Sequence, residues 1–210
     1  NLTMALSEQE IVRRENLQKI IDLGIDPYPG MEYPVDAFAE SINASFNQDE
    51  ENQKSVCIAG RLMSKRIMGK ASFAEIQDSS GRIQIYVNRD EICPEEDKTL
   101  YNTVFKKLLD IGDFIGRTGK PFVTKMGEIT VRASQLNLLS KSLKPLPIVK
   151  TDAEGKTHDA VTDPDFRYRQ RYVDLVVNPE IREVFKKRTR IYTSMREFLD
   201  ARGYLEVETP

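Results

Sequence analysis

Side chains that could bind a flat, polar ligand recur between residues 56 and 87 of this chain. Alternation with period two indicates strands, and it places five side chains on the face turned away from the core: Arg61, Phe73, Glu75, Gln84 and Tyr86. A solvated sheet face normally carries Lys, Glu and Thr, so a Phe among hydrogen-bonding groups is unusual there. Nucleobases are flat and polar, and stacking on an aromatic side chain contributes about 1–3 kcal/mol per base. The pattern therefore predicts a surface that binds nucleobases.

Three successive antiparallel strands are needed to hold these residues on one surface. The inward positions are apolar and mostly β-branched: Val56, Ile58, Leu62, Ala74, Ile76, Ile83, Ile85 and Val87. Two other interpretations of the outward residues stay open. Phe73 could pack beneath the N-terminal helix, and Arg61 and Glu75 could form a plain cross-strand ion pair.

The order of elements predicts a mainly β chain with helices, built on a five-stranded OB-fold barrel. Strands are expected near residues 55–67, 71–78, 82–88, 113–124 and 129–140. Residues 88–96 are expected to be a loop, and residues 97–109 a helix between the third and fourth strands. An SH3-like barrel is the rival fold, but a long helix in that position argues against it. Glycines inside strands are typical of barrels, which need bends and bulges, and three occur here: Gly60, Gly116 and Gly119.

A helix is expected ahead of the barrel. Ser7 and Glu10 form a capping box, and Gly24 is the stop signal. The apolar stripe of this helix is thin, and three cations are expected to be exposed: Arg13, Arg14 and Lys19. They fit either an ordinary solvated face or a helix laid against the phosphate backbone of a nucleic acid.

A second unit is expected after the barrel, so the predicted domains are residues 1–54, 55–147 and 148–210. Residues 141–162 read as a polar linker with prolines, and a helix is expected from Asn178 to Gly203. This helix is expected to be disordered or paired with another copy, because it carries an unpartnered apolar stripe: Ile181, Phe185, Tyr192, Met195 and Phe198. Residues 204–210 begin a strand with nothing to pair against, which predicts a truncated protein.

Composition excludes several classes of protein. The chain has 31 Lys and Arg against 33 Asp and Glu, a net charge of -2, which is not typical of a protein that binds polyanions over its whole surface. Nucleic acid would therefore have to bind a local patch. Cys57 and Cys93 lie far apart without metal-ligand spacing, which predicts reduced thiols and no metal site. The absence of a long apolar run or a signal peptide predicts a soluble, cytoplasmic protein with no membrane partner.

Four stretches carry a family resemblance. The C-terminal GYLEVETP and the helix before it resemble motif 1 of the class II aminoacyl-tRNA synthetases. Three others are similar to bacterial-type lysyl-tRNA synthetases: RRENLQKIIDLGIDPYP, RIMGKASFAEIQDSSGRIQIYV and RYRQRYVDL. The resemblance runs from Glu10 to Pro210 and implies an anticodon-binding OB-fold barrel followed by the start of a class II catalytic domain.

The resemblance also implies roles for individual residues. In this family the barrel binds an anticodon whose middle base is uridine. Phe73 matches the residue that stacks on this base, Gln84 the residue that reads its edge, and Arg61 is matched to a contact from the first strand. Glu128, in the turn before the fifth strand, would accept a hydrogen bond from an anticodon base, and Glu75 lies on the same face.

The implied chemistry belongs to the full-length enzyme. Such an enzyme activates lysine with ATP and Mg²⁺, transfers it to tRNA(Lys), and forms a homodimer through the motif 1 helix. The adenylate site lies in motifs that these residues do not contain, so this fragment is expected to be inactive and to bind no cofactor, and no catalytic residue is assigned. The alternatives are a stand-alone OB module for single-stranded nucleic acid, which has no use for motif 1, and an aspartyl- or asparaginyl-tRNA synthetase relative.

Overall fold

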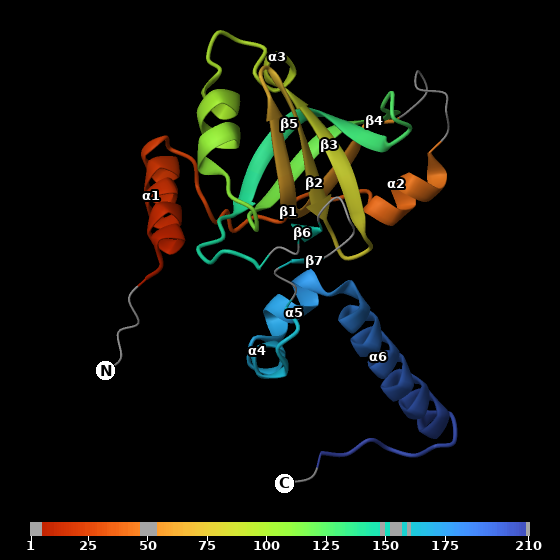
Figure 1. The fold of residues 1–210 in the computed structure, drawn as a ribbon. Coiled ribbons are helices and arrows are strands. Elements are labelled where there is room, and N and C mark those ends of the chain that lie inside the picture. The colour runs from red at the N-terminus through yellow and green to blue at the C-terminus, as the bar shows by residue number, and fades with distance from the viewer. Residues whose placement is uncertain (1–5, 47–53, 148–149, 152–156, 159–160, 209–210) are drawn as a thin grey trace. The chain divides into compact units, whose positions relative to one another are not determined.

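The computed structural model describes residues 6–46, 54–147, 150–151, 157–158 and 161–208 (Figure 1). The chain divides into two compact units, residues 1–145 and residues 146–210. The N-terminal helices therefore belong to the same compact unit as the strands that follow them. The separate domain predicted for residues 1–54 stays a prediction.

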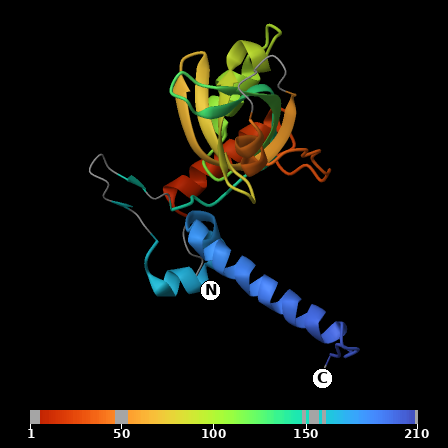
Figure 2. The same cartoon turned by 90° about the vertical axis from the view of Figure 1, so that its right-hand side faces the viewer.

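The first unit contains the predicted OB-fold barrel, which is confirmed. The barrel is closed, in the order β1-β2-β3-β5-β4, with β3 and β5 parallel and the other neighbours antiparallel. Each strand begins and ends within one residue of its predicted bounds: β1 Val56–Met68, β2 Ala71–Gln77, β3 Arg82–Asn88, β4 Phe114–Val123 and β5 Ile129–Ser140. Figure 2 shows the closed barrel from a second side.

Apolar side chains from every strand fill the barrel, as the alternation predicts. Each fully buried residue of this kind stabilises the fold by about 1.5–3 kcal/mol. The most buried include Ile58, Leu62, Ile76, Ile85, Val87, Ile115, Val131 and Ala133. Gly119 is required where β4 pairs with β5, because a Cβ atom there would lie 1.9 Å from the carbonyl oxygen of Arg132. The register of the two strands also shifts at this point, between Thr118 and Gly119.

A bulge at Met63 divides β1 into two parts. The register against β2 shifts between Leu62 and Ser64, so one extra residue is inserted in β1. Beyond the bulge, the pairing is fixed by the two-residue turn at Gly69, whose φ of 69° suits a tight hairpin. Arg66 consequently lies opposite Phe73 on the outer face of the barrel.

Helices cover part of the barrel. α1 (Glu8–Asp22) carries the predicted capping box. The helix predicted for residues 97–109 is present over Leu100–Leu108 and has π-helical hydrogen bonding (η2). The Lys65 ammonium group donates to three carbonyl oxygens at the C-terminal end of η2. Two short helices were not predicted, α2 (Ala39–Ser45) and α3 (Arg89–Ile92). The second corrects the expectation of a loop over residues 88–96, since Asn88 accepts from the Asp90 N–H and caps a helical turn.

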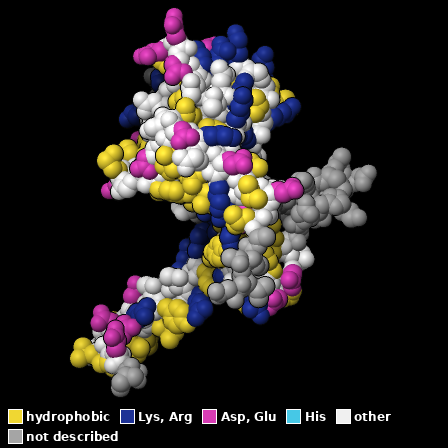
Figure 3. Space-filling view, turned by 90° about the vertical axis from the view of Figure 1, so that its left-hand side faces the viewer, with side chains coloured by type: hydrophobic (Ala, Val, Ile, Leu, Met, Phe, Trp, Pro, Cys, Tyr) yellow, Lys and Arg dark blue, Asp and Glu magenta, His cyan; other side chains and the backbone are white. Residues whose placement is uncertain are grey.

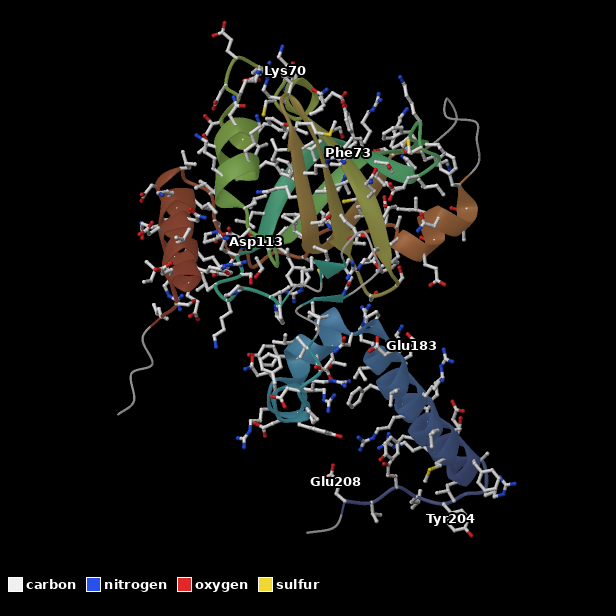
Figure 4. The ribbon with its side chains drawn as sticks, viewed as in Figure 1. Lys70, Phe73, Asp113, Glu183, Tyr204 and Glu208 are labelled. Carbon is white, nitrogen blue, oxygen red and sulfur yellow. The ribbon has the colours of Figure 1, made fainter. Side chains whose placement is uncertain are left out.

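A buried ion cluster of Asp110, Asp113 and Lys141 joins α1 to the barrel (Figure 4 labels Asp113). The side chains of Lys141 and Asp113 are fully buried, and the Lys141 ammonium nitrogen lies 3.0 Å from the Asp113 carboxylate. Asn16 of α1 donates to Asp110 at 3.3 Å. Burial raises the pKa of Asp113, although Lys141 and two backbone N–H groups act in the opposite direction.

The described residues of the second unit form a two-stranded hairpin and three helices. β6 (Lys150–Thr151) pairs with β7 (Thr157–His158) inside the predicted linker, which is therefore partly structured. α4 (Pro164–Arg169) and α5 (Arg171–Val177) are held by Asp174, a buried carboxylate that accepts from Arg167, Arg171 and Asn178.

Helix α6 (Pro179–Asp200) follows and exposes a row of apolar side chains (Figure 3): Val184, Phe185, Ile191, Tyr192, Met195, Phe198 and Leu199. The strand predicted from Tyr204 is not formed among residues 204–208, which have no strand to pair with in the part of the chain that is described. No helix among the described residues is long and apolar enough to span a membrane.

Candidate nucleic-acid interface

A groove of about 450 Å³ opens on the outer face of the barrel, between the β1–β2 hairpin and the turn joining β4 to β5. It brings together four residues that the sequence predicted as a site: Phe73, Glu75, Gln84 and Glu128. Its other lining residues include Arg66 and two Met side chains, Met68 and Met126. The groove thus combines an aromatic ring with donors and acceptors of both charges.

Phe73 supplies the aromatic ring of the groove (Figure 4). It is half-buried in β2, and its ring centroid lies 5.3 Å from that of Tyr86 on β3. The N-terminal helix packs against η2 instead of covering this ring, so the alternative in which Phe73 packs beneath that helix is wrong. A ring fixed by one aromatic neighbour and open to a groove can stack on a base.

Gln84 has its amide group hydrogen-bonded at both ends. The amide nitrogen Nε2 donates to the Glu128 carboxylate at 2.7 Å, and the amide oxygen Oε1 accepts from the Thr130 hydroxyl at 2.8 Å. Glu128 itself is exposed, in a turn closed by a hydrogen bond from the Thr124 N–H to the Glu128 carbonyl oxygen. Since an amide has two N–H groups and two oxygen lone pairs, Gln84 keeps one donor and one acceptor site for a ligand.

Glu75 lines the groove and forms an ion pair with Arg82, with 3.2 Å between the two groups. Both side chains are partly exposed, at 35% and 43%, so the pair contributes at most about 1 kcal/mol to stability. The alternative of a cross-strand pair between Arg61 and Glu75 is therefore wrong. A pair this weak leaves the Glu75 carboxylate able to exchange partners.

Arg61 does not line the groove, although it lies on the predicted outer face. It pairs with Gln77, at the far end of β2 from Phe73. Its guanidinium group donates to the Gly112 carbonyl oxygen at 3.0 Å and lies 4.2 Å from the centre of the Phe114 ring. Burial lowers the pKa of Arg61, and Asp113 partly offsets that effect.

The arginine that does line the groove is Arg66, which the sequence interpretation missed. Strict alternation from Val56 cannot find it, because the bulge at Met63 changes the phase of the strand. Counting back from the two-residue turn at Gly69 does find it, since Met68 then faces Ala71 and Arg66 faces Phe73. The turn was the better starting point for assigning the pairing.

The three cations of α1 have different environments. Arg13 is only 8% exposed and donates to the carbonyl oxygens of Ser142 and Ile111, which corrects the expectation that it is exposed. Arg14 is half-buried and donates to the Glu10 carbonyl oxygen of its own helix. Lys19 is exposed. Of the three, Lys19 is the cation freest to contact a phosphate group.

Next to the groove, the barrel surface continues as aromatic rings and a cation. Tyr86 lies edge-on to Phe122 of β4, with 6.1 Å between the ring centres. The guanidinium carbon of Arg132 lies 5.0 Å from the centre of the Phe122 ring. Arg132 is exposed, so positive charge and stacking surface adjoin the groove in a chain that is slightly acidic as a whole.

Comparison with known proteins supports this view of the surface. Residues 56–139 match the family of OB-fold nucleic acid binding domains, and residues 163–210 match the class II tRNA synthetases of the D, K and N type. The chain is 56% identical over 208 residues to a lysine–tRNA ligase from Porphyromonas gingivalis, which covers 99% of the chain and 36% of that relative. A lysine–tRNA ligase from Christiangramia forsetii is 57% identical over 210 residues, again with 36% of the relative covered.

A more distant relative gives the same result. The lysine–tRNA ligase of a Thermoanaerobacter species is 49% identical over 213 residues, covering 100% of the chain and 39% of the relative. The chain thus spans well under half the length of the curated relatives it matches.

Proposed function

We propose that this chain reads the anticodon of a lysine tRNA as part of a lysine–tRNA ligase. It belongs to the OB-fold nucleic acid binding domains over residues 56–139 and to the class II tRNA synthetases over residues 163–210. The observation that carries the proposal is the groove. It places an open aromatic ring beside an amide with an unused donor and acceptor, on the domain that matches the nucleic-acid-binding family.

The groove divides recognition between two kinds of contact. Phe73 stacks on the face of the middle anticodon base, which gives affinity for any base. Gln84 hydrogen-bonds along the edge of that base, which distinguishes one base from another. Glu128 accepts from a base donor at the mouth of the groove, and Arg66 supplies positive charge opposite Phe73. Arg61 contributes only by supporting the loop at Gly112, because its guanidinium group is already engaged there.

The match over residues 163–210 favours a synthetase over a stand-alone OB module, which would not carry class II sequence. That match covers aspartate, lysine and asparagine enzymes together. The relatives that distinguish among them are lysine–tRNA ligases, at 49–57% identity over essentially the whole chain. Lysine is therefore the amino acid we propose.

In the proposed enzyme, lysine and ATP would form lysyl-adenylate with release of pyrophosphate, and Mg²⁺ would bind the ATP phosphates. The lysyl group would then pass to tRNA(Lys) with release of AMP. The described residues contain no group of three or more His, Cys, Asp and Glu side chains that could hold a metal ion. We assign no residue of this chain to ATP, Mg²⁺ or lysine. The chain alone is expected to give no lysine-dependent exchange of pyrophosphate into ATP, which a radiolabelled exchange assay measures directly.

Helix α6 is proposed to pair with a second copy in the enzyme. Its support is the exposed apolar row, in which Ile191 is 61%, Met195 54% and Phe198 56% exposed. Soluble monomers rarely leave such a row uncovered. Sedimentation of the chain is expected to give a dimer, and replacing Ile191 and Phe198 by Ser is expected to shift it toward monomer.

Binding to anticodon stem-loops tests the proposed function. Two RNA hairpins, identical except for uridine or cytidine at the middle anticodon position, are titrated with the chain and followed by fluorescence anisotropy. The uridine hairpin is expected to bind more tightly, and a duplex of the stem alone is expected to bind only weakly. Equal affinity for the two hairpins contradicts the proposal that the groove reads this base.

A further inference from the structure

One row of outward side chains crosses all five strands of the barrel. Each member is paired with the next by the register of neighbouring strands. In the strand order β1, β2, β3, β5 and β4, the row is Arg66, Phe73, Tyr86, Arg132 and Lys120. The groove takes in only the first two members. The row therefore continues beyond the groove, and it ends in two cations.

These two cations, Arg132 and Lys120, form a cation pair across β5 and β4, where they lie directly opposite each other. Cβ atoms of opposite residues in antiparallel strands are about 4.5–5.5 Å apart, and like charges in such positions are destabilising. Both side chains are exposed. In the part of the chain that the structure describes, neither forms an ion pair or a side-chain hydrogen bond. The fold thus keeps two adjacent positive charges without neutralising them.

Arg132 is held by aromatic rings instead of a counter-ion. Its guanidinium carbon lies 5.0 Å from the centre of the Phe122 ring and 5.7 Å from that of Tyr86. Contacts of this kind orient the planar group without using its N–H donors, so all of them remain available to a ligand. Guanidinium donors match the oxygens of a phosphate group, and an ammonium group adds a compact charge. The cation pair is therefore suited to a phosphate.

The surface between the groove and the cation pair is continuous. The rings of Phe73, Tyr86 and Phe122 are successive neighbours, with 5.3 and 6.1 Å between their centres. Arg132 lies two strands away from Phe73, about 10 Å at the usual spacing of strands. An RNA strand with one base in the groove can therefore bring a nearby phosphate to the cation pair.

We propose that Arg132 and Lys120 form a phosphate subsite, which binds a backbone phosphodiester next to the middle anticodon base. This inference rests on the proposed function and adds to it a contact that holds the strand without reading its sequence. It also explains how a chain with a net charge of -2 attracts RNA, because the charge that matters is local. The repulsion between the two cations is relieved when the phosphate binds.

The salt dependence of hairpin binding tests the subsite. In the double variant Arg132→Gln, Lys120→Gln, the slope of log affinity against log salt is expected to fall by about 0.7, the value for one single-stranded phosphate. With no electrostatic contribution at about 1 M salt, this slope corresponds to roughly 5-fold weaker binding at about 0.1 M, equal for the uridine and cytidine hairpins. An unchanged slope overturns the proposal.

Two control variants show whether position matters as well as charge. Lys120→Arg keeps the cation pair and is expected to keep the slope. Lys107→Gln removes an exposed charge from η2, outside the row, and is also expected to keep it. If Lys107→Gln lowers the slope as much as the double variant does, the effect comes from net charge and the subsite is overturned.

A change in the RNA identifies the group that is bound. A methylphosphonate linkage removes the charge of one phosphate, and it is placed at each position of the anticodon loop in turn. At one linkage beside the middle base, the unmodified chain is expected to lose about 5-fold in affinity at about 0.1 M salt, and the double variant is expected to lose nothing further. Additive losses at every linkage would show that the cation pair touches no phosphate, which overturns the proposal.

Stability of the free chain separates binding from a structural role. Lys120→Gln removes the repulsion with Arg132, so its urea midpoint is expected to rise although RNA binds more weakly. A lower midpoint together with unchanged affinity of the folded chain would make Lys120 a structural residue and overturn the subsite. Equal affinity for the two hairpins, with the expected fall in slope, would overturn only the proposed reading of the middle base. Retained discrimination with an unchanged slope would overturn only the subsite.

Discussion

The groove and the buried ion cluster both join carboxylates to nitrogen donors, one at the surface of the barrel and one away from water. In the groove, Gln84 retains an unused donor and acceptor, and Glu128 is exposed. In the ion cluster, the Lys141 ammonium group is shared between Asp110 and Asp113. The Asp113 carboxylate also accepts hydrogen bonds from two backbone N–H groups. Similar chemical groups thus hold α1 in place in one region and remain available to a ligand in the other.

Burial, more than residue type, decides whether a charged side chain in this unit serves folding or binding. A buried charge that loses its partner is costly, so its contacts cannot be exchanged for those of a ligand. An exposed or half-buried polar group exchanges its contacts at little cost. Variants in the two regions should therefore affect different measurements.

Replacing Lys141 by Met should give the largest loss of stability. It leaves Asp113 buried beside Asp110 without the shared cation, which is expected to lower the free energy of unfolding by about 3–5 kcal/mol. Urea unfolding measures this loss. The matched control in the groove is Glu128→Gln, expected to change stability by no more than about 0.5 kcal/mol. Similar losses for the two variants would remove the contrast between the regions.

Replacing Arg13 by Ala should act on folding as well, although the sequence suggested a role in RNA binding. The variant loses two charge-assisted hydrogen bonds to the carbonyl oxygens of Ser142 and Ile111, a loss of about 1.5–3 kcal/mol. Thermal unfolding checks this result. The control is the exposed Lys19→Ala, expected to leave stability unchanged and to reduce the salt dependence of RNA binding by about one unit of slope. If Arg13→Ala instead reduced the salt dependence of RNA binding and Lys19→Ala lowered stability, Arg13 would belong to the RNA-binding surface.

Replacing Phe73 by Ala should weaken RNA binding more than it weakens the fold. Loss of stacking on one base is expected to reduce hairpin affinity by about 1–3 kcal/mol, or roughly 5- to 150-fold. The fold loses the contact with Tyr86, worth no more than about 1.5 kcal/mol. Anisotropy titrations and urea unfolding of the same preparation compare the two losses. If Phe73→Ala unfolds readily in urea but its folded fraction binds the hairpin with unchanged affinity, Phe73 is a core residue and not a binding residue.

The smallest effect concerns pH. Burial raises the pKa of Asp113 in the folded state, so this carboxyl binds its proton more tightly when the chain is folded. Its contribution to stability is then greatest below the unfolded pKa of about 4 and declines as the pH rises through the folded pKa. The stability advantage of the unmodified chain over Asp113→Asn, measured by urea unfolding, should therefore shrink from pH 4 toward pH 7.

Asp78 provides the opposite case as a control. Burial alone would raise its pKa, but hydrogen bonds from the Ala39 N–H, the Ser80 hydroxyl and the Gly81 and Ser80 N–H groups outweigh it, and the pKa is lowered. Its contribution to stability is present above the unfolded pKa and is lost in acid. The advantage of the unmodified chain over Asp78→Asn should therefore grow with pH. The same slope for both variants would contradict the assigned directions.

The strands could be predicted from the sequence because alternation and turn residues agree along most of the barrel. Side-chain contacts could not be predicted equally well. Arg61 and Arg66 are both arginines on β1, and the bulge between them makes alternation counted from Val56 select Arg61, although Arg66 is the one that pairs with Phe73. A bulge adds one residue without a characteristic residue type, so composition does not mark it.

The helices show a second limit. Arg13 on α1 is expected to face solvent because of its residue type. It is buried instead, and it donates to two carbonyl oxygens that lie far from it in the sequence. The C-terminal end of η2 also makes tertiary contacts that spacing does not encode, among them the three hydrogen bonds from Lys65.

The bulge at Met63 also separates two parts of β1 that have different partners. The part of β1 before the bulge closes the barrel against β4, and the part after it carries Arg66 and Met68 in the hairpin with β2. A single extra residue lets each part keep its own phase. Substitutions in the hairpin therefore need not change the phase of the segment that closes the barrel against β4.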